Sequence, residues 1–392
     1  MTTRSGVSKA ANVPEPETSP GDAATASSEV WIGVATGSRW RWTYAIGFAL
    51  VLVSGFAAAL LNPALPRSPS ERFSDGSWAE AYQRSFDAAS PLLAPARTAW
   101  GIIDTGLFGQ GRLGVLVGEE GWLYSREEYA TVPDAAGAIE ATVARIASVR
   151  SSLAEQDIDL VVALVPAKAA MVPEHAPAPL PAAAAERYEA LVTQLRRAGV
   201  IVSDLRPPLA GLPDGTPAYL RTDTHWTPAG AAVAAASIAD TIDEHAPFDG
   251  LGQRRYRTEL GSLHEHWGDL TVFLDLGPLL PRLGPPADML AVPQTRSLDP
   301  ASGDLFGPVE VPVALVGTSY SADPSWNAAG ALREALGADV IDAAVSGLGP
   351  WEPMRRYLEG EAFVTARPQV VIWEFPERYA TLEGYGPEVT AW

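Results

Sequence analysis

Residues 159–166 read DLVVALVP, a run of apolar residues that has the length of a β-strand and ends at a proline. A second run, VPVALVG at residues 311–317, has the same character. Strands that are apolar on both faces are typical of a parallel sheet that helices cover on both sides. These two segments therefore predict a buried parallel sheet at the centre of the fold.

Strand-like and helix-like segments alternate around these two runs. Further strands are predicted over residues 200–205, 340–345 and 370–375, and helices over residues 136–156, 182–198, 227–244, 326–336 and 351–358. This order indicates an α/β domain whose central parallel sheet is flanked by helices. A hairpin is predicted around the Glu-Glu-Gly at residues 119–121. Residues 246–310 are rich in Pro, Gly and Leu, break the alternation and are interpreted as an insertion.

Composition excludes several classes of function. The chain has 392 residues, 47% of them hydrophobic, which is enough for the core of one large domain or two ordinary ones. Its formal net charge of −19, without a dense Lys/Arg cluster, argues against nucleic acid as the main partner. The absence of cysteine excludes disulfides, thiolate nucleophiles and cysteine-bound zinc or iron–sulfur centres.

One segment near the start predicts a membrane helix. Residues 43–61 carry no charge, and as a helix they would span ~28 Å at ~1.5 Å per residue, close to the thickness of the hydrocarbon core. Arginine and aromatic residues precede the segment, as at a membrane interface. We expect a disordered cytoplasmic tail over residues 1–38, a transmembrane signal anchor over 39–62, a juxtamembrane linker and helical region over 63–112, and an outer domain over 113–392.

Two polar motifs point to one catalytic site. Residues 219–231 read YLRTDTHWTPAGA and place Asp223 two residues before His225. Ser319 lies in GTSYSADPSWN, directly after a predicted strand, at the edge where parallel sheets carry their active sites. A serine becomes a strong nucleophile when a histidine takes its proton and a carboxylate orients that histidine. The residue types predict a Ser-His-Asp triad, with simple helix capping as the alternative for Ser319.

Both motifs resemble signature blocks of the alginate O-acetyltransferase family, AlgJ and AlgX type, which carries an SGNH-hydrolase-like domain. GEEGWLYSREE at residues 118–128, VALVPAKAAMVPEH at 162–175 and VVIWEFPERYA at 370–380 resemble further blocks of this family. The similarity extends from about residue 113 to 379. We expect no C-terminal carbohydrate-binding module of the AlgX type after residue 379, and on this expectation the chain resembles the AlgJ type more.

The resemblance implies a membrane-anchored O-acetyltransferase that modifies hydroxyl groups of an exopolysaccharide through an acetyl-serine. It assigns Ser319 as nucleophile, His225 as base and Asp223 as orienting acid, with no metal and no other cofactor. It also implies a single-pass protein of the inner membrane, a periplasmic catalytic domain, and a membrane-bound O-acyltransferase partner that supplies acetyl groups. Alginate is itself anionic, so a neutral polymer such as cellulose stays open for a chain of charge −19.

Two other functions remain open from the sequence. A carbohydrate or polysaccharide acetyl esterase would use the same triad, because only the acceptor of the acetyl group differs. A non-catalytic sugar-binding subunit of an export complex is the third possibility, and the presence of all three triad residues weighs against it.

Several further residues are candidates for the site. Lys168 and Arg378 follow predicted strand ends, and Tyr320 and Trp226 adjoin the triad residues. We expect these four to contact the substrate. Each has a structural alternative: a solvated lysine, a solvated arginine, or an aromatic ring that packs the histidine loop against the core.

Two glycines and two histidines complete the candidates. Gly347 and Gly349 precede a predicted helix and are candidate donors of a backbone N–H to an oxyanion, with an ordinary turn as the alternative. The stretch HEHWGD at residues 264–269 would place His264 and His266 on one face of a strand, as in a metal site. A solvated loop is the favoured interpretation of that stretch.

Overall fold

The computed structural model describes residues 38–61, 76–89, 93–299 and 311–382. Contacts within the chain divide it into two units, residues 1–90 and residues 91–392. The tail predicted over residues 1–38 lies outside the described residues except for Ser38. All the residues of the predicted site lie in the second unit.

The described part of the first unit is helical. It contains α1 (Ser38–Leu61) and α2 (Ser77–Ala89), and α1 covers the apolar segment at residues 43–61. Across the described ranges, no helix combines the length and the apolar character that crossing a membrane requires. The transmembrane helix predicted over residues 39–62 is therefore not found in the structure.

The second unit begins with α3 (Leu93–Phe108) and a small antiparallel hairpin. Strands β1 (Val115–Val117) and β2 (Leu123–Ser125) pair across the one-turn helix η1 (Glu119–Gly121). Glu120 and Gly121 both have positive φ, 51° and 80°, which closes the turn between the strands. The hairpin predicted at this position is confirmed.

The centre of the second unit is a parallel sheet of five strands in the order β4-β3-β9-β7-β8. All neighbouring pairs are parallel. The predicted strands are confirmed, with these bounds: β3 (Asp159–Val165), β4 (Ile201–Asp204), β7 (Val313–Val316), β8 (Val340–Asp342) and β9 (Val370–Pro376).

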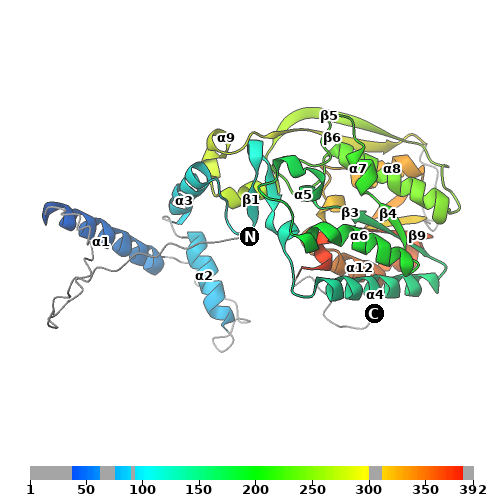
Figure 1. Ribbon diagram of the computed structural model, residues 1–392, viewed down its shortest axis with the longest axis horizontal. Coiled ribbons are helices and arrows are strands. Elements are labelled where there is room, and N and C mark those ends of the chain that lie inside the picture. The colour runs from blue at the N-terminus through cyan, green and yellow to red at the C-terminus, as the bar shows by residue number, and fades with distance from the viewer. Residues whose placement is uncertain (1–37, 62–75, 90–92, 300–310, 383–392) are drawn as a thin grey trace, which may run out of the picture. The chain divides into compact units, whose positions relative to one another are not determined.

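Helices cover both faces of this sheet, as predicted. One face packs against α4 (Ala135–Ala154), α6 (Ala182–Arg197) and α12 (Trp351–Glu359), and the other against α8 (Pro228–His245) and α11 (Ala328–Leu336). Figure 1 shows α4, α6 and α12 on one side of the strands and α8 on the other. Alternate residues of β3 enter the two cores: Leu160, Val162 and Leu164 face α4 and α6, while Val161 and Ala163 face α8.

Short helices connect these elements. They are η2 (Arg126–Tyr129), α5 (Lys168–Met171), η3 (Pro173–His175), α7 (Arg206–Ala210), η4 (Asp269–Leu274), η5 (Gly277–Leu279), α9 (Leu280–Leu283), α10 (Ser319–Ala322), α13 (Glu361–Ala366) and η6 (Glu377–Ala380).

The segment interpreted as an insertion contains two long strands that the sequence did not reveal. Strands β5 (Tyr256–His266) and β6 (Asp288–Ser297) form a separate antiparallel pair, with a register shift between Leu260 and Leu263. Most side chains of β5 are exposed on both faces. The alternation of apolar and polar residues that identifies a half-buried strand is therefore missing from this segment.

The core of the sheet supports a direct stability test. Ile372 on β9 is fully buried between β3 and β7. We expect Ile372→Ala to lower the free energy of unfolding by about 2–5 kcal/mol, and Ile372→Val by about 0.5–1.5 kcal/mol. Denaturant unfolding of both variants measures this, with exposed Val364→Ala as a control expected to change stability by less than about 0.5 kcal/mol. Equal stability of Ile372→Ala and the control would contradict this assignment of the core.

Candidate active site

The serine lies at the carboxyl edge of the central sheet, as predicted. Strand β7 ends at Val316, and Ser319 is the first residue of α10. Gly317, between them, packs on Glu374 of β9 so closely that a Cβ at this position would lie 2.5 Å from Glu374 Oε2. The side chain of Thr318 accepts a hydrogen bond from the N–H of Tyr320 (3.4 Å) and caps the helix. These contacts hold the serine turn on the sheet.

A short hairpin-like loop carries the aspartate and the histidine. Tyr219 and Trp226 form an isolated antiparallel bridge, and Asp223 and His225 lie in the loop that this bridge closes. The hydroxyl of Tyr219 donates to the carbonyl of Pro166 (2.5 Å), which ties the loop to the end of β3. Thr227 then caps α8 by accepting from Gly230 N–H (3.0 Å). The loop is thereby fixed at both ends.

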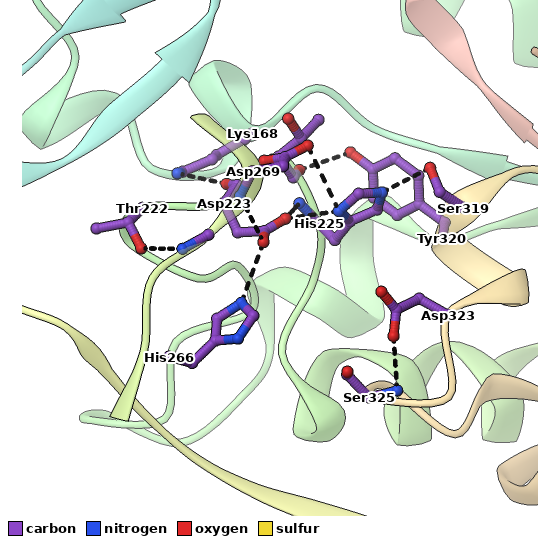
Figure 2. A network of polar contacts seen from close by, with 12 residues as sticks. Lys168, Thr222, Asp223, His225, His266, Asp269, Ser319, Tyr320, Asp323 and Ser325 are labelled. Carbon is purple, nitrogen blue, oxygen red and sulfur yellow. Dashed lines mark hydrogen bonds and ion pairs between the residues drawn. The ribbon is translucent and has the colours of Figure 1, made fainter. Parts of the chain in front are cut away.

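The structure brings the three triad candidates into contact (Figure 2). His225 Nε2 lies 2.7 Å from Ser319 Oγ, and His225 Nδ1 lies 2.5 Å from Asp223 Oδ1. Asp223 and His225 are buried, while Ser319 is partly exposed. With its proton on Nδ1, His225 donates to Asp223 and leaves Nε2 to accept the hydroxyl proton of Ser319. This is the arrangement that activates a serine nucleophile.

The carboxylate of Asp223 has donors on both oxygens. Its Oδ1 also accepts from His225 N–H (2.9 Å), while Oδ2 accepts from Asp269 N–H (3.1 Å) and contacts His266 Nε2 (3.2 Å). Burial raises the pKa of Asp223, but the hydrogen bonds from His225 and His266 outweigh it, so this pKa stays well below its usual range. Asp223 is therefore ionised throughout the physiological pH range and can stabilise an imidazolium at His225.

Aromatic rings hold the imidazole of His225 in place. The Tyr320 ring meets it edge-on with centroids 4.8 Å apart, and the Trp326 ring stacks on it at 5.5 Å. The hydroxyl of Tyr320 donates to the carbonyl of Thr224 (2.8 Å). Both aromatic side chains are buried. Their packing restricts the histidine to the orientation that reaches Ser319.

A cavity of about 610 Å³ opens beside the serine. His225, Ser319, Asp269, Arg378 and Glu127 are among the side chains that line it. Ser319 and His225 thus face a space that can admit an ester and an acceptor, lined by two cationic side chains, Arg126 and Arg378, and two acidic ones. Another hollow of about 600 Å³, between the β5–β6 hairpin and helices α8 and α11, is lined mainly by apolar side chains and does not contain the triad.

The structure corrects the expectation that Lys168 contacts substrate. Lys168 is fully buried, and its Nζ donates to the carbonyls of Leu123 (2.6 Å), Arg221 (2.9 Å) and Asp223 (2.9 Å). Burial lowers its pKa to about 8, although Glu128 and other carboxylates oppose that change. Lys168 uses all three donors to join the β1–β2 hairpin to the aspartate loop.

The expectation that Tyr320 and Trp226 contact the substrate is corrected for the same reason, burial. Tyr320 is fully buried and Trp226 is 2% exposed, so neither ring is open to a sugar. Their rings pack against each other with centroids 5.2 Å apart. Trp226 therefore holds the histidine loop against the core, which is the alternative that the sequence also offered.

Of the remaining candidates, Arg378 lies at the cavity, whereas Gly347 and Gly349 do not line it. Arg378 lines the cavity, where its Nε donates to Glu127 (3.1 Å) and its Nη1 to the hydroxyl of Tyr320 (3.3 Å). Its contact with substrate stays a prediction. Gly347 and Gly349 adopt positive φ, 81° and 63°, in the turn before α12, and neither lines the cavity. Their role as oxyanion donors also stays a prediction.

The HEHWGD stretch lies at the end of β5 rather than in a solvated loop, so the favoured interpretation was wrong. His264 is exposed, while His266 turns toward Asp223. Within the described residues, the one group of three side chains that could hold a metal ion is Asp223, His225 and Asp269, whose ligand atoms lie within 4.8 Å of one another. It does not include the His264–His266 pair that the spacing suggested. Asp223 and His225 in that group already pair with each other.

Glu374 is a site residue that the sequence did not single out. Its buried carboxylate accepts from Thr318 N–H (2.7 Å) and from Thr318 Oγ1 (3.0 Å), directly below the serine turn. Burial raises its pKa to about 7, although the hydrogen bonds from Thr318 oppose that change. The only sequence signal was its place in the WEFPERY block, which gives no hint that its partner is the residue before Ser319.

The raised pKa of Glu374 predicts a pH-dependent stability. The folded protein holds this proton more tightly than the unfolded chain, so the stabilisation is full below the ordinary pKa of 4.5 and is lost as pH rises to about 7. We expect the stability of the wild type, relative to Glu374→Gln, to fall over this range by on the order of 3 kcal/mol. Thermal unfolding between pH 4.5 and 8 measures it, with exposed Glu186→Gln as the control. Parallel curves for wild type and Glu374→Gln would rule this out.

Comparison with known proteins is consistent with this geometry. A family model described as "SGNH hydrolase-like domain, acetyltransferase AlgX" matches residues 115–377. A "Probable alginate O-acetylase AlgJ" from Azotobacter vinelandii is 42% identical over 333 residues, which cover 83% of this chain and 82% of that protein. An "Alginate biosynthesis protein AlgX" from Pseudomonas aeruginosa is 31% identical over 205 residues, which cover 50% of this chain and 41% of that protein.

Solved structures give the same order of similarity. The "O-Acetyltransferase Domain of Pseudomonas putida AlgJ" has a TM-score of 0.63 and 40% identity, and the match covers 69% of this chain and 93% of that one. Pseudomonas aeruginosa AlgX has a TM-score of 0.52 and 27% identity, with 67% and 62% covered. The chain therefore belongs to the family of SGNH hydrolase-like acetyltransferase domains that AlgJ and AlgX share, and it is more similar to the AlgJ relatives than to the AlgX relatives.

Proposed function

We propose that this protein is an O-acetyltransferase that moves acetyl groups to hydroxyl groups of a polysaccharide through an acetyl ester on Ser319. The observation that carries the proposal is the continuous contact from Ser319 Oγ to His225 Nε2 (2.7 Å) and from His225 Nδ1 to Asp223 Oδ1 (2.5 Å). The names of the relatives, alginate O-acetylase and acetyltransferase, support the reaction class.

The first half-reaction acylates the enzyme. His225 Nε2 takes the hydroxyl proton of Ser319 while Oγ attacks the carbonyl carbon of the donor's acetyl group. The tetrahedral intermediate then collapses: the bond to the donor oxygen breaks, and the leaving oxygen receives the proton from His225 Nε2. The products are acetyl-Ser319 and the deacetylated donor. Asp223 keeps the imidazole oriented and stabilises its cationic form in both steps.

The second half-reaction transfers the acetyl group. A sugar hydroxyl in the cavity gives its proton to His225 Nε2 and attacks the carbonyl of acetyl-Ser319. The Ser319 Oγ–carbon bond breaks, and Oγ recovers its proton from His225. Each intermediate carries an oxyanion, for which backbone N–H groups are the expected donors. Gly347 and Gly349 remain candidates for this role.

Alginate is the first acceptor to test. The relatives named alginate O-acetylase support it, and the cavity offers cationic side chains in Arg126 and Arg378, which suit the carboxylates of a uronate polymer. This local charge can favour an anionic polymer in spite of the net charge of −19. A membrane-bound O-acyltransferase is the proposed source of the acetyl group, and the resemblance to the AlgJ type supports it.

Substitution at the nucleophile tests the proposed chemistry. We expect Ser319→Ala to lower acetyl transfer from a chromogenic acetyl ester to alginate oligosaccharides by about 10³-fold or more, because no acyl intermediate can form. Ser325→Ala is the matched control, since this serine lies in the same segment and its backbone N–H, not its hydroxyl, binds Asp323. Acetylated sugar would be measured by mass spectrometry. Release of acetate to water alone would make the protein an esterase, and undiminished transfer by Ser319→Ala would refute the mechanism.

We also propose that residues 39–62 attach the protein to the inner membrane and leave the catalytic unit in the periplasm. Support comes from the uncharged run at residues 43–61 and from α1, where large apolar side chains such as Phe48 (67%) and Phe56 (66%) are exposed. Water disfavours such a surface, and lipid would cover it.

Membrane extraction tests this attachment. We expect the full chain to stay in the membrane fraction after washing with alkaline carbonate, and a chain without residues 1–62 to be released. Both should cleave a small acetyl ester at the same rate, because the site lies wholly in the second unit. Release of the full chain by carbonate would contradict the anchor.

A further inference from the structure

The base of the β5–β6 hairpin lies against the aspartate loop. His266, the last residue of β5, pairs with Asp288, the first residue of β6. The Asp288 carboxylate accepts from the N–H groups of Arg221 (2.8 Å) and Thr222 (3.0 Å) and from the hydroxyl of Thr222 (2.7 Å). The hairpin therefore fixes the two residues that precede Asp223, although the hairpin is not part of the central sheet.

The chain after His266 then wraps closely around Asp223. Gly268 N–H donates to the hydroxyl of Thr222 (2.9 Å), and Asp269 accepts from Thr224 N–H (2.8 Å). A Cβ at residue 268 would lie 2.4 Å from Asp223 Cβ and 2.5 Å from its Cα, so only glycine permits this approach. The segment thereby brings the side chain of His266 to the oxygen of Asp223 that faces away from His225.

Asp223 consequently lies between two imidazoles (Figure 2). His225 Nδ1 contacts Oδ1 (2.5 Å), and His266 Nε2 contacts Oδ2 (3.2 Å). The ring of His266 also meets Trp326 edge-on at 5.8 Å, and Trp326 stacks on His225. The side chain of His266 is 24% exposed, so it is half-enclosed rather than solvated.

We propose that His266 is a positioning residue that extends the triad to Ser319–His225–Asp223–His266. With its proton on Nε2, His266 donates to Asp223 Oδ2 and prevents the carboxylate from rotating away from His225. This inference rests on the proposed function of Ser319, and the experiment below distinguishes the failure of the inference from the failure of that function. The β5–β6 hairpin then serves catalysis by supplying the partner of the acid.

A carboxylate keeps one orientation only when donors hold both of its oxygens. An aspartate has two oxygens and turns about its last bond, and a donor on one oxygen alone leaves that rotation open. Here Asp269 N–H and His266 Nε2 occupy Oδ2 from two directions. The charges that face His266 are those of Asp223, Asp288 and Asp323, all of which favour an imidazole that carries an Nε2 proton. The hydrogen bond to Asp223 and these charges raise the pKa of His266.

Two substitutions separate the hydrogen bond from the packing of the ring. His266→Phe keeps a ring against Trp326 but has no donor, while His266→Gln keeps a donor but has no ring. His264→Phe is the matched control, because His264 lies on the same strand, is exposed and has no contact with Asp223. Hydrolysis of p-nitrophenyl acetate by the full-length variants gives kcat and KM, and proton NMR reports the low-field resonance of the His225–Asp223 hydrogen bond.

We expect His266→Phe to lower kcat by about 10- to 100-fold, the effect of losing one hydrogen bond to a charged group, with KM unchanged and the low-field resonance shifted. His266→Gln should recover most of kcat, and His264→Phe should match the wild type. The inference would be overturned if His266→Phe kept the wild-type kcat and an unshifted resonance. It would also be overturned if the kcat of His266→Gln were as low as that of His266→Phe. Equal turnover by the wild type and Ser319→Ala would instead refute the proposed function. In that case, the shift of the His225–Asp223 resonance in His266→Phe would still show whether His266 positions Asp223.

Discussion

The site depends on one buried carboxylate. Asp223 is 3% exposed, and a charge in such a place is stable only if donors compensate for the lost water. His225 supplies its backbone N–H and its ring to one oxygen, and His266 and Asp269 supply donors to the other. These donors come from the aspartate loop, from the end of β5 and from the start of η4. Satisfying one charge thus forces three segments of the chain into a fixed arrangement around the histidine.

Three further buried ionisable side chains, Lys168, Glu128 and Glu374, extend this arrangement. Lys168 binds the aspartate loop to the β1–β2 hairpin through three backbone carbonyls, and Glu128 accepts from the N–H groups of Lys168 (3.1 Å) and Ala169 (2.8 Å). Glu374 on β9 holds the turn before Ser319, because its carboxylate accepts from the N–H of Thr318. None of these three side chains has to touch a substrate. In the proposed reaction they keep Ser319, His225 and Asp223 in place before the substrate binds. Such preorganisation is a main source of transition-state stabilisation in enzymes.

The sequence predicted the central sheet and the triad for clear physical reasons. Apolar runs such as residues 159–166 identify strands buried on both faces, and Asp223, His225 and Ser319 are an uncommon combination of residue types at predicted loop positions. It did not predict the partner of Glu374, because that contact depends on how β7 and β9 lie side by side. It misjudged His266, because the exposed strand β5 lacks an alternating pattern. Lys168 was misassigned because a position after a strand end does not say whether the side chain enters the cavity or the core.

Detection of the acetyl group on Ser319 itself would decide whether the proposed reaction takes place. The full-length protein would be mixed briefly with p-nitrophenyl acetate, quenched in acid, digested and analysed by mass spectrometry. We expect one acetyl group on the peptide that contains Ser319. It should form as fast as nitrophenol is first released, and it should be lost when alginate oligosaccharide is added before the quench. Turnover of the ester with no acetyl group on Ser319, or with the group on another residue, would contradict the proposed reaction.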